Sequence, residues 1–262
     1  MRVTATKMST HHCQIPLKMV LYSYVIAPCE HFCTGSLFYQ MRRHIMNNYR
    51  MGTKCVQAGY KPGNGEPRQI PIIQSTTFKY DSSAEMGDLF DLKKSGYFYS
   101  RLQNPTCDNV ASKIAALEGG VAGLATASGA AAISYVFQAL ASAGDHIVAA
   151  KTIYGGTYNY LAHTFPHSGV TTTFVDPDDV QNFEDAIQDN TKAIFIETLG
   201  NPNSNIIDIK AVAEIAHKHN IPLVVDDTFT TPYLLRPIEL GADIIASSAT
   251  KFIGGHGTTL GG

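Results

Sequence analysis

The sequence has no tryptophan and is poor in charged residues. Asp, Glu, Lys and Arg make up 16% of its 262 residues, and the formal net charge is −2. Nucleic acids and anionic membrane surfaces are bound by basic patches, so we expect neither as a partner. No uninterrupted apolar run is long enough to cross a bilayer. The hydrophobic fraction of 44% is typical of a globular protein with a large core.

Cysteine is also scarce. The five cysteines are odd in number and three of them fall within the first 33 residues. They indicate no disulfide framework and favour a reducing compartment, which we take to be the cytoplasm. Cys29-Glu30-His31-Phe32-Cys33, with His11–Cys13 upstream, suggests a zinc site. The cysteine spacing is wide for a zinc knuckle and no second pair follows, so we predict no metal site.

Residues 1–50 lack any clear period and differ from the rest of the chain. The run Met19–Ala27 resembles a weak signal-peptide core, but Pro28-Cys29 follow it where small residues are expected, which argues against a signal peptide. We expect either a poorly ordered extension or a translation start at Met46 or Met51.

Residues 51–105 have the pattern of an N-terminal arm. The segment Ile70–Phe78 is rich in β-branched residues but contains Pro71, which predicts an extended arm or an edge strand. Further along, Tyr99 and Arg101 lie in a loop-like stretch. An arginine beside a tyrosine suits a phosphate clamp, and a solvated or ion-paired arginine is an equal alternative.

Residues 106–262 alternate between apolar runs and amphipathic segments, which predicts an α/β fold with a mainly parallel sheet covered on both faces. The expected helices are Thr106–Glu118 with Thr106 as N-cap, Ser128–Ala141, Tyr154–His167, Asp179–Ile187 and Ile209–His219. The expected strands are Ala122–Ala127, Ile147–Ala150, Thr171–Val175, Ala193–Glu197, Leu223–Asp226 and Asp243–Ala246. In such sheets, ligands bind beyond the carboxyl ends of the strands.

Three candidate sites fall at those ends. Ala127–Ala130 joins a strand to a helix N-terminus whose free N–H groups suit a phosphate; a tight turn with a serine cap is the alternative. Asp226 ends an apolar run, so its buried carboxylate needs a partner, such as a protonated pyridine nitrogen. Tyr154 follows another strand, where its ring can stack on a flat ligand or pack in the core.

A fourth site surrounds Lys251. An apolar run leads to Ser248 and Thr250, whose hydroxyls can donate to a phosphate, and then to the lysine and a glycine-rich loop. A lysine that bonds covalently to a carbonyl compound needs a dry, fixed position, whereas most lysines are solvated. The lysine, acid, anion cup and aromatic ring together match what pyridoxal phosphate requires of a protein.

These residues resemble the Cys/Met-metabolism, or transsulfuration, family of pyridoxal-phosphate enzymes. The matching stretches are Tyr99–Thr106, Ala127–Gly129, Tyr154–Thr157, Asn201-Pro202, Val225–Phe229 and Ser248–Gly257. Within the family, Cys55–Pro62 looks like the beginning of the sulfhydrylases that act on O-acetylhomoserine. The resemblance implies the large domain of a fold-type I transferase.

The resemblance also implies roles. Lys251 would form the Schiff base and shuttle protons, Asp226 would pair with the ring nitrogen, Tyr154 would stack on the ring and assist proton transfer, Asn201 would approach the ring hydroxyl, and Ser248, Thr250, Gly129 and Ala130 would hold the phosphate. Tyr99 and Arg101 would reach the phosphate of a neighbouring subunit, so a dimer, usually paired into a tetramer, is expected.

The implied reaction is γ-replacement on O-acetylhomoserine by sulfide or methanethiol, giving homocysteine or methionine plus acetate. A γ- or β-lyase on methionine or cystathionine is the alternative, disfavoured because methionine γ-lyases usually have cysteine at the position of Gly156. A non-catalytic fragment that keeps the fold is a third possibility.

Two departures from the family stand out. Asp227 occupies a position where the family commonly has asparagine, and a second buried carboxylate would raise a pKa. The chain ends at Gly262, before the smaller C-terminal domain and the arginine that binds the substrate carboxylate in the family. We therefore expect residues 1–262 alone to bind the cofactor weakly and to turn over poorly.

Overall fold

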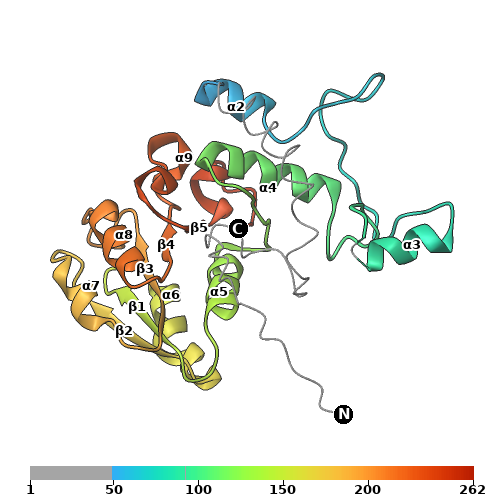
Figure 1. The fold of residues 1–262 in the computed structure, drawn as a ribbon. Helices are drawn as coiled ribbons and strands as arrows, with labels where there is room; N and C mark the ends of the chain where they lie inside the picture. The colour runs from blue at the N-terminus through green and yellow to red at the C-terminus, as the bar shows by residue number, and fades with distance from the viewer. Residues whose placement is uncertain (1–48, 92) are drawn as a thin grey trace, which may run out of the picture.

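A five-stranded parallel sheet forms the centre of the molecule (Figure 1). The computed structural model describes residues 49–91 and 93–262. The strands are β1 His146–Ala150, β2 Thr171–Val175, β3 Thr191–Glu197, β4 Leu223–Asp226 and β5 Ile244–Ala246. Their order is β2-β1-β3-β4-β5, and every neighbouring pair is parallel. The predicted parallel α/β architecture is confirmed.

Helices cover the sheet, with α7 and α8 on one side and α5 on the other in Figure 1. The α-helices are α2 Met51–Gln57, α3 Ser83–Phe90, α4 Pro105–Glu118, α5 Gly129–Leu140, α6 Gly155–Asn159, α7 Gln181–Ala186, α8 Ile209–Lys218 and α9 Thr231–Leu234. The π-helical segments are η3 Tyr160–Thr164 and η6 Ala249–Ile253, and the 3₁₀ segments are η4 Phe165–Ser168 and η5 Pro237–Leu240. None of the helices in the described part of the chain is long and apolar enough to cross a membrane.

The core lies between the sheet and its helices. Every residue of β1 and of β4 is buried, which is why both strands read as short runs with no polar alternation. Phe137 of α5 packs edge-on against Phe195 of β3, with ring centroids 5.3 Å apart and an interplanar angle of 71°. Burying one such side chain contributes about 1.5–3 kcal/mol. The apolar face of α5 is thereby fixed on the sheet, which places the N-terminus of α5 at the carboxyl ends of the strands.

Three details of the predicted elements are wrong. Ala122–Ala127 is not a strand: Thr126 exchanges two backbone hydrogen bonds with Gly262, and no other strand pairing joins this segment to the described sheet. Asn104, not Thr106, caps α4, because its side chain accepts from the Thr106 N–H at 2.9 Å. The expected single helix Tyr154–His167 is instead α6, η3 and η4 in succession, the last with proline in its first turn.

The N-terminal arm runs outside the sheet, with α2 against α4 and α3 far from the strands (Figure 1). Side chains hold the segment before α3 in an extended form. The Thr106 hydroxyl accepts from the Ile73 N–H at 3.0 Å and donates to the Pro71 carbonyl at 2.9 Å. Asn104 donates to the Ile73 carbonyl at 3.0 Å. The cysteine- and histidine-containing stretch that suggests zinc, the run Met19–Ala27 and the alternative start at Met46 lie outside the described residues.

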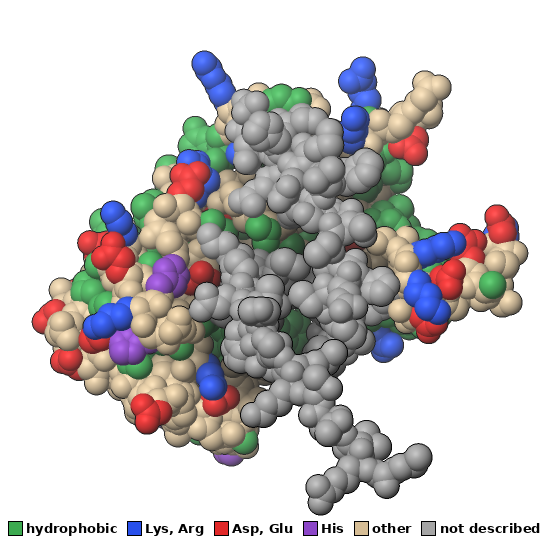
Figure 2. All heavy atoms as spheres, viewed as in Figure 1, with side chains coloured by type: hydrophobic (Ala, Val, Ile, Leu, Met, Phe, Trp, Pro, Cys, Tyr) green, Lys and Arg blue, Asp and Glu red, His purple; other side chains and the backbone are tan. Residues whose placement is uncertain are grey.

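Figure 2 shows one face of the molecule, on which lysine and arginine side chains lie interspersed with aspartate and glutamate. Several charged side chains of the described structure form ion pairs, such as Lys151–Asp176 at 2.5 Å and Lys218–Glu184 at 2.8 Å. Because the two signs alternate, the described side chains on this face form no basic stripe of the kind that follows a nucleic-acid backbone.

Candidate cofactor site

The N-terminus of α5 forms an anion cup at the carboxyl edge of the sheet. Ser128 caps the helix by accepting from the Ala131 N–H at 3.1 Å. Gly129 and Ala130 come next, and no described acceptor is bonded to their backbone N–H groups. Free N–H groups and the positive end of the helix dipole stabilise an anion at this place.

Gly129 also brings α5 against the loop that follows β5. A Cβ built on Gly129 would lie 2.5 Å from the Cβ of Ser248, a distance that side chains cannot adopt. The glycine is therefore required for the close approach. The Ser248 hydroxyl has no hydrogen bond to any described residue, so it is available at the mouth of the cup. The structure thus brings Gly129, Ala130 and Ser248 together, the arrangement that the family resemblance implies.

A short chain of hydrogen bonds links this cup to Asp226. The Ser248 N–H donates to the Thr228 hydroxyl at 2.8 Å, and that hydroxyl donates to Asp226 Oδ1 at 2.5 Å. The Thr228 N–H donates to the same oxygen at 2.9 Å. Thr228 thus fixes the Asp226 carboxyl relative to the anion cup, a role that the sequence did not reveal.

Asp226 is buried at the end of β4, as predicted. Burial raises the pKa of its carboxyl, and the two hydrogen bonds from Thr228 oppose that rise. None of the described cationic side chains pairs with it, and no described group donates to Oδ2. A buried carboxyl with one oxygen oriented and the other free fits the protonated nitrogen of a pyridine ring.

Tyr154 is anchored by a residue that we did not predict. Its backbone N–H donates to Glu197 Oε1 at 2.6 Å, and its ring remains exposed. Glu197 ends β3 and is the register partner of Asp226 on β4. Burial, followed by repulsion from Asp226, raises the pKa of Glu197 to about 8. The signal in the sequence was the same as for Asp226: an acid that ends a fully apolar strand.

Lys251 lies in η6, directly after β5. Its backbone angles, φ −93° and ψ −117°, interrupt the helical turn. Its side chain is exposed and none of the described acceptors bonds to its ammonium, so the described residues do not provide the dry position that a Schiff-base lysine needs. The neighbouring Thr250 hydroxyl exchanges hydrogen bonds with Gly261, at 3.3 Å to its carbonyl and 3.2 Å from its N–H. Lys251 is accessible to a ligand, but within these described residues nothing shields it from water.

The remaining predicted residues divide into two groups. Asn201 lies beside the end of β1, since its N–H donates to the Thr152 carbonyl at 3.1 Å. Tyr99 and Arg101 belong to the arm, where the guanidinium carbon lies 5.1 Å from the centre of the tyrosine ring. The structure does not bring this pair to the other site residues of the same chain.

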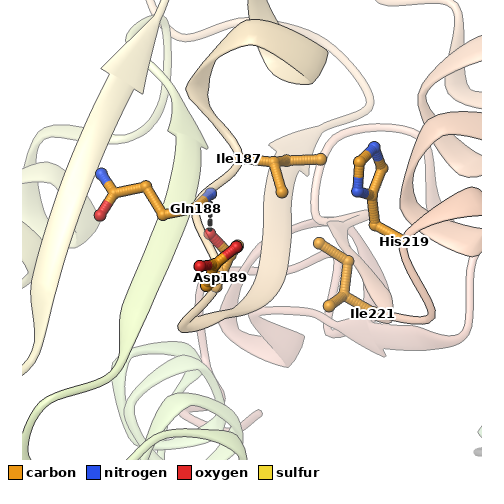
Figure 3. A pocket seen from close by; sticks show the side chains of 6 residues that line it. Ile187, Gln188, Asp189, His219 and Ile221 are labelled. Carbon is orange, nitrogen blue, oxygen red and sulfur yellow. Dashed lines mark hydrogen bonds between the residues drawn. The ribbon is translucent and has the colours of Figure 1, made fainter.

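One described cavity, of about 300 Å³, lies at the opposite edge of the sheet (Figure 3). Its wall is formed by Ile187, Gln188, Asp189, Thr191, His219 and Ile221. These residues precede β3 and β4 or begin them, so the cavity is at the amino ends of the strands. It is separate from the site at the carboxyl ends.

Comparison with known proteins shows the family of the chain. The sequence model of the family described as "Cys/Met metabolism PLP-dependent enzyme" matches residues 52–262. The chain is 44% identical to O-acetyl-L-homoserine sulfhydrylase of Leptospira meyeri over 82% of its length and 49% of the relative. It is 42% identical to L-methionine gamma-lyase of Treponema denticola over 85% of its length and 56% of the relative. The chain thus spans about half the length of these relatives.

A solved structure agrees with the sequence comparisons. A putative O-acetylhomoserine (thiol)-lyase from Campylobacter jejuni, which carries N'-pyridoxyl-lysine-5'-monophosphate, has a TM-score of 0.80 and 38% identity. The match covers 82% of this chain and 53% of that one. The anion cup, the buried acid and the exposed ring fit the phosphate, ring nitrogen and face of such a cofactor. The chain belongs to the Cys/Met-metabolism family of pyridoxal-phosphate-dependent enzymes.

Proposed function

We propose that this chain carries the cofactor-binding part of an enzyme that performs γ-replacement on O-acetylhomoserine. Sulfide or methanethiol would take the place of acetate, giving homocysteine or methionine. The observation that carries the proposal is the Asp226–Thr228–Ser248 hydrogen-bond chain, which joins a ring-nitrogen acid to a phosphate cup next to Lys251. The sulfhydrylase and homocysteine synthase relatives, at 44% and 46% identity, support the substrate.

Each residue would have a defined task. The N–H groups of Gly129 and Ala130, with the Ser248 and Thr250 hydroxyls, bind the phosphate. Asp226 holds a proton against the ring nitrogen, and bound pyridoxal phosphate supplies the electron sink for the reaction. Lys251 Nζ would hold the cofactor, and its amine would move the proton at the substrate Cα. Tyr154 would stack on the ring and assist proton transfer, while Asn201 would orient the ring hydroxyl.

A second copy of the chain is part of the proposal. Tyr99 and Arg101 lie on the arm, away from their own chain's site, and would contact the phosphate held by a neighbouring subunit. We therefore propose a dimer as the active unit, assembled into a tetramer. The described cysteines, Cys55 and Cys107, are both free, which supports a reducing compartment such as the cytoplasm.

A lyase that cleaves methionine is the second candidate, because methionine gamma-lyases are 42% and 47% identical to this chain. Gly156 favours replacement instead. A Cβ on Gly156 would lie 2.4 Å from Cε1 of the Tyr154 ring, so the described ring position has no room for the cysteine usual in such lyases. The structure of this ring therefore supports the sulfhydrylase.

The test is product analysis with the purified full-length protein and added pyridoxal phosphate. One reaction contains O-acetylhomoserine and sulfide, and the other contains methionine alone. Homocysteine in the first without methanethiol in the second supports the proposal, whereas methanethiol from methionine supports the lyase. Absence of both products, with no visible absorbance from lysine-bound cofactor, would indicate a non-catalytic protein that keeps the fold.

A further inference from the structure

Two carboxyl groups that have no task in the proposed reaction lie behind Asp226. Glu118 is the last residue of α4, and Asp227 follows Asp226 directly. Their exposed fractions are 3% and 0%. A carboxyl at such a depth is unfavourable unless it is hydrogen-bonded or paired.

Nearly all of the usual partners are missing. The Thr230 hydroxyl donates to Asp227 Oδ1. Neither Asp227 Oδ2 nor either oxygen of Glu118 receives a hydrogen bond from a donor in the described structure. The two buried carboxyls are close enough to influence each other. Two carboxylates have no donor between them, so a hydrogen bond between them requires a proton on one of them.

The charges around the pair do not replace that proton. Arg236 faces Glu118, but its guanidinium is bonded to Glu239, from Nε to Oε1 at 2.6 Å and from Nη2 to Oε2 at 2.8 Å. On the other side, Asp226 faces Asp227 and adds a like charge.

The pKa values of Glu118 and Asp227 are both raised, so that each carboxyl keeps a proton more readily. Burial raises the pKa of Glu118 to about 8, and repulsion from Asp227 adds to the rise. Burial also raises the pKa of Asp227 to about 7, and hydrogen bonding by the Thr230 and Thr198 hydroxyls opposes this rise. Glu197 is a further buried acid that faces Asp226. The carboxyls of Glu118, Asp226, Asp227 and Glu197 therefore lie together with too little positive charge nearby to balance them.

We propose that Glu118 and Asp227 share one proton, and that the resulting hydrogen bond positions the loop after β4 against the C-terminal end of α4. This loop carries Thr228, which orients the Asp226 carboxyl, and it leads into α9, which packs on α4. The pair consists of positioning residues that act on the site through Asp226. When the shared proton is lost, two buried like charges repel each other and the loop is released. The link to the cofactor rests on the proposed function, whereas the shared proton does not.

The test uses the full chain and its denaturant unfolding between about pH 5 and about pH 8. The folded state holds a proton that the unfolded chain releases, so raising the pH increases the unfolding equilibrium constant. Asp227→Asn provides a permanent N–H donor to the Glu118 carboxylate while keeping Oδ1 for Thr230. In the unaltered chain the shared proton makes the unfolding equilibrium constant increase by about tenfold per pH unit, and this increase should be absent in Asp227→Asn. Glu118→Gln places the N–H donor on residue 118 instead of residue 227 and should have the same effect.

Glu214→Gln, an exposed change on α8, is the matched control and should leave the profile unchanged. The dissociation constant for pyridoxal phosphate is the second measurement: it should rise with pH in the unaltered chain and change less in Asp227→Asn. Parallel unfolding profiles for the unaltered chain and a folded variant would overturn the shared proton. If Asp227→Asn does not fold, the Glu118→Gln profile decides. If the unfolding profiles differ as expected but no variant binds the cofactor, the pair stands and the proposed function fails.

Discussion

Gly129 and Ser248 approach each other so closely that neither a Cβ nor a larger group fits on the glycine. A Cβ would lie 2.5 Å from Ser248 Cβ and 2.9 Å from its hydroxyl oxygen. The contact joins the N-terminus of α5 to the loop after β5, and these are the two elements of the anion cup. The width of the cup is therefore set by the absence of a single methyl group.

Gly129→Ala should widen this contact and weaken the protein. Forcing a methyl group into a packed site costs about 1–3 kcal/mol, and the displaced Ser248 no longer faces the phosphate. We expect a lower free energy of unfolding and weaker pyridoxal phosphate binding, measured by denaturant titration and by cofactor absorbance. Gly87→Ala in α3 is the control, because a Cβ there meets nothing within 4 Å; it should be neutral or stabilise the helix. Unchanged cofactor binding in Gly129→Ala would argue against the cup.

Glu197 should position Tyr154 through its side-chain oxygen. Glu197→Ala leaves the Tyr154 N–H without its acceptor, a loss of about 1–3 kcal/mol. Glu197→Gln keeps an oxygen in the same place and should retain most of the stability. Denaturant unfolding of both variants, together with the cofactor dissociation constant, measures the difference. Equal losses in the two variants would show that the charge, not the hydrogen bond, matters.

Lys251→Ala should abolish the visible absorbance of lysine-bound cofactor and lower the rate of product formation. Loss of a positioned acid–base group costs about 10²- to 10⁴-fold in rate, and loss of the covalent link adds to it. The exposed Lys210 of α8 provides a matched control in Lys210→Ala. If Lys251→Ala retained the absorbance band, another lysine would hold the cofactor.

His146 should make the protein less stable in acid. The ring lies in β1, where Nδ1 is 2.9 Å from the Thr191 hydroxyl and Nε2 is 2.9 Å from the Thr173 hydroxyl. Burial lowers its pKa below the usual 6.5, so the unfolded chain takes up the proton more readily. Its contribution is fully present above about pH 6.5 and is lost as the pH falls below that value.

Comparison of His146→Asn with the exposed-site control His167→Asn tests this expectation. His146→Asn should be less stable at neutral pH by about 1 kcal/mol for a lost hydrogen bond, and its stability should depend less on pH in the acid range. The control should follow the unaltered chain at every pH. A His146→Asn profile parallel to that of the control would refute the role of the buried ring.

The sheet could be predicted because its strands are short runs of apolar residues between helical segments. The expected ranges Thr171–Val175 and Leu223–Asp226 agree with β2 and β4 in full. Ala122–Ala127 has a similar composition, yet composition does not tell whether a neighbouring strand is present. A ladder needs a partner on the other side, and here Thr126 pairs with Gly262 alone among the described residues.

The candidate site could be predicted only where its residues follow directly from the apolar strands. Residues that end strands, such as Asp226 and Tyr154, were identified because the position of a strand end follows from the apolar run. The proposed hydrogen bond between Glu118 and Asp227 would join segments far apart in the chain, and no local pattern marks it. The exposure of Lys251 was left open for the same reason, because local sequence does not show what covers a loop.

The parallel order of β1, β3, β4 and β5 also determines when the site can form. Each strand is joined to the next by a crossover, and the site residues follow these strands one after another. Pairing between segments distant in sequence is the slow part of folding, because loop closure precedes any gain from contacts. No local fragment of the chain can assemble the cup and the acid together. Cofactor binding should therefore appear during refolding only when the sheet is complete. The rate at which binding appears would then report the rate of sheet formation.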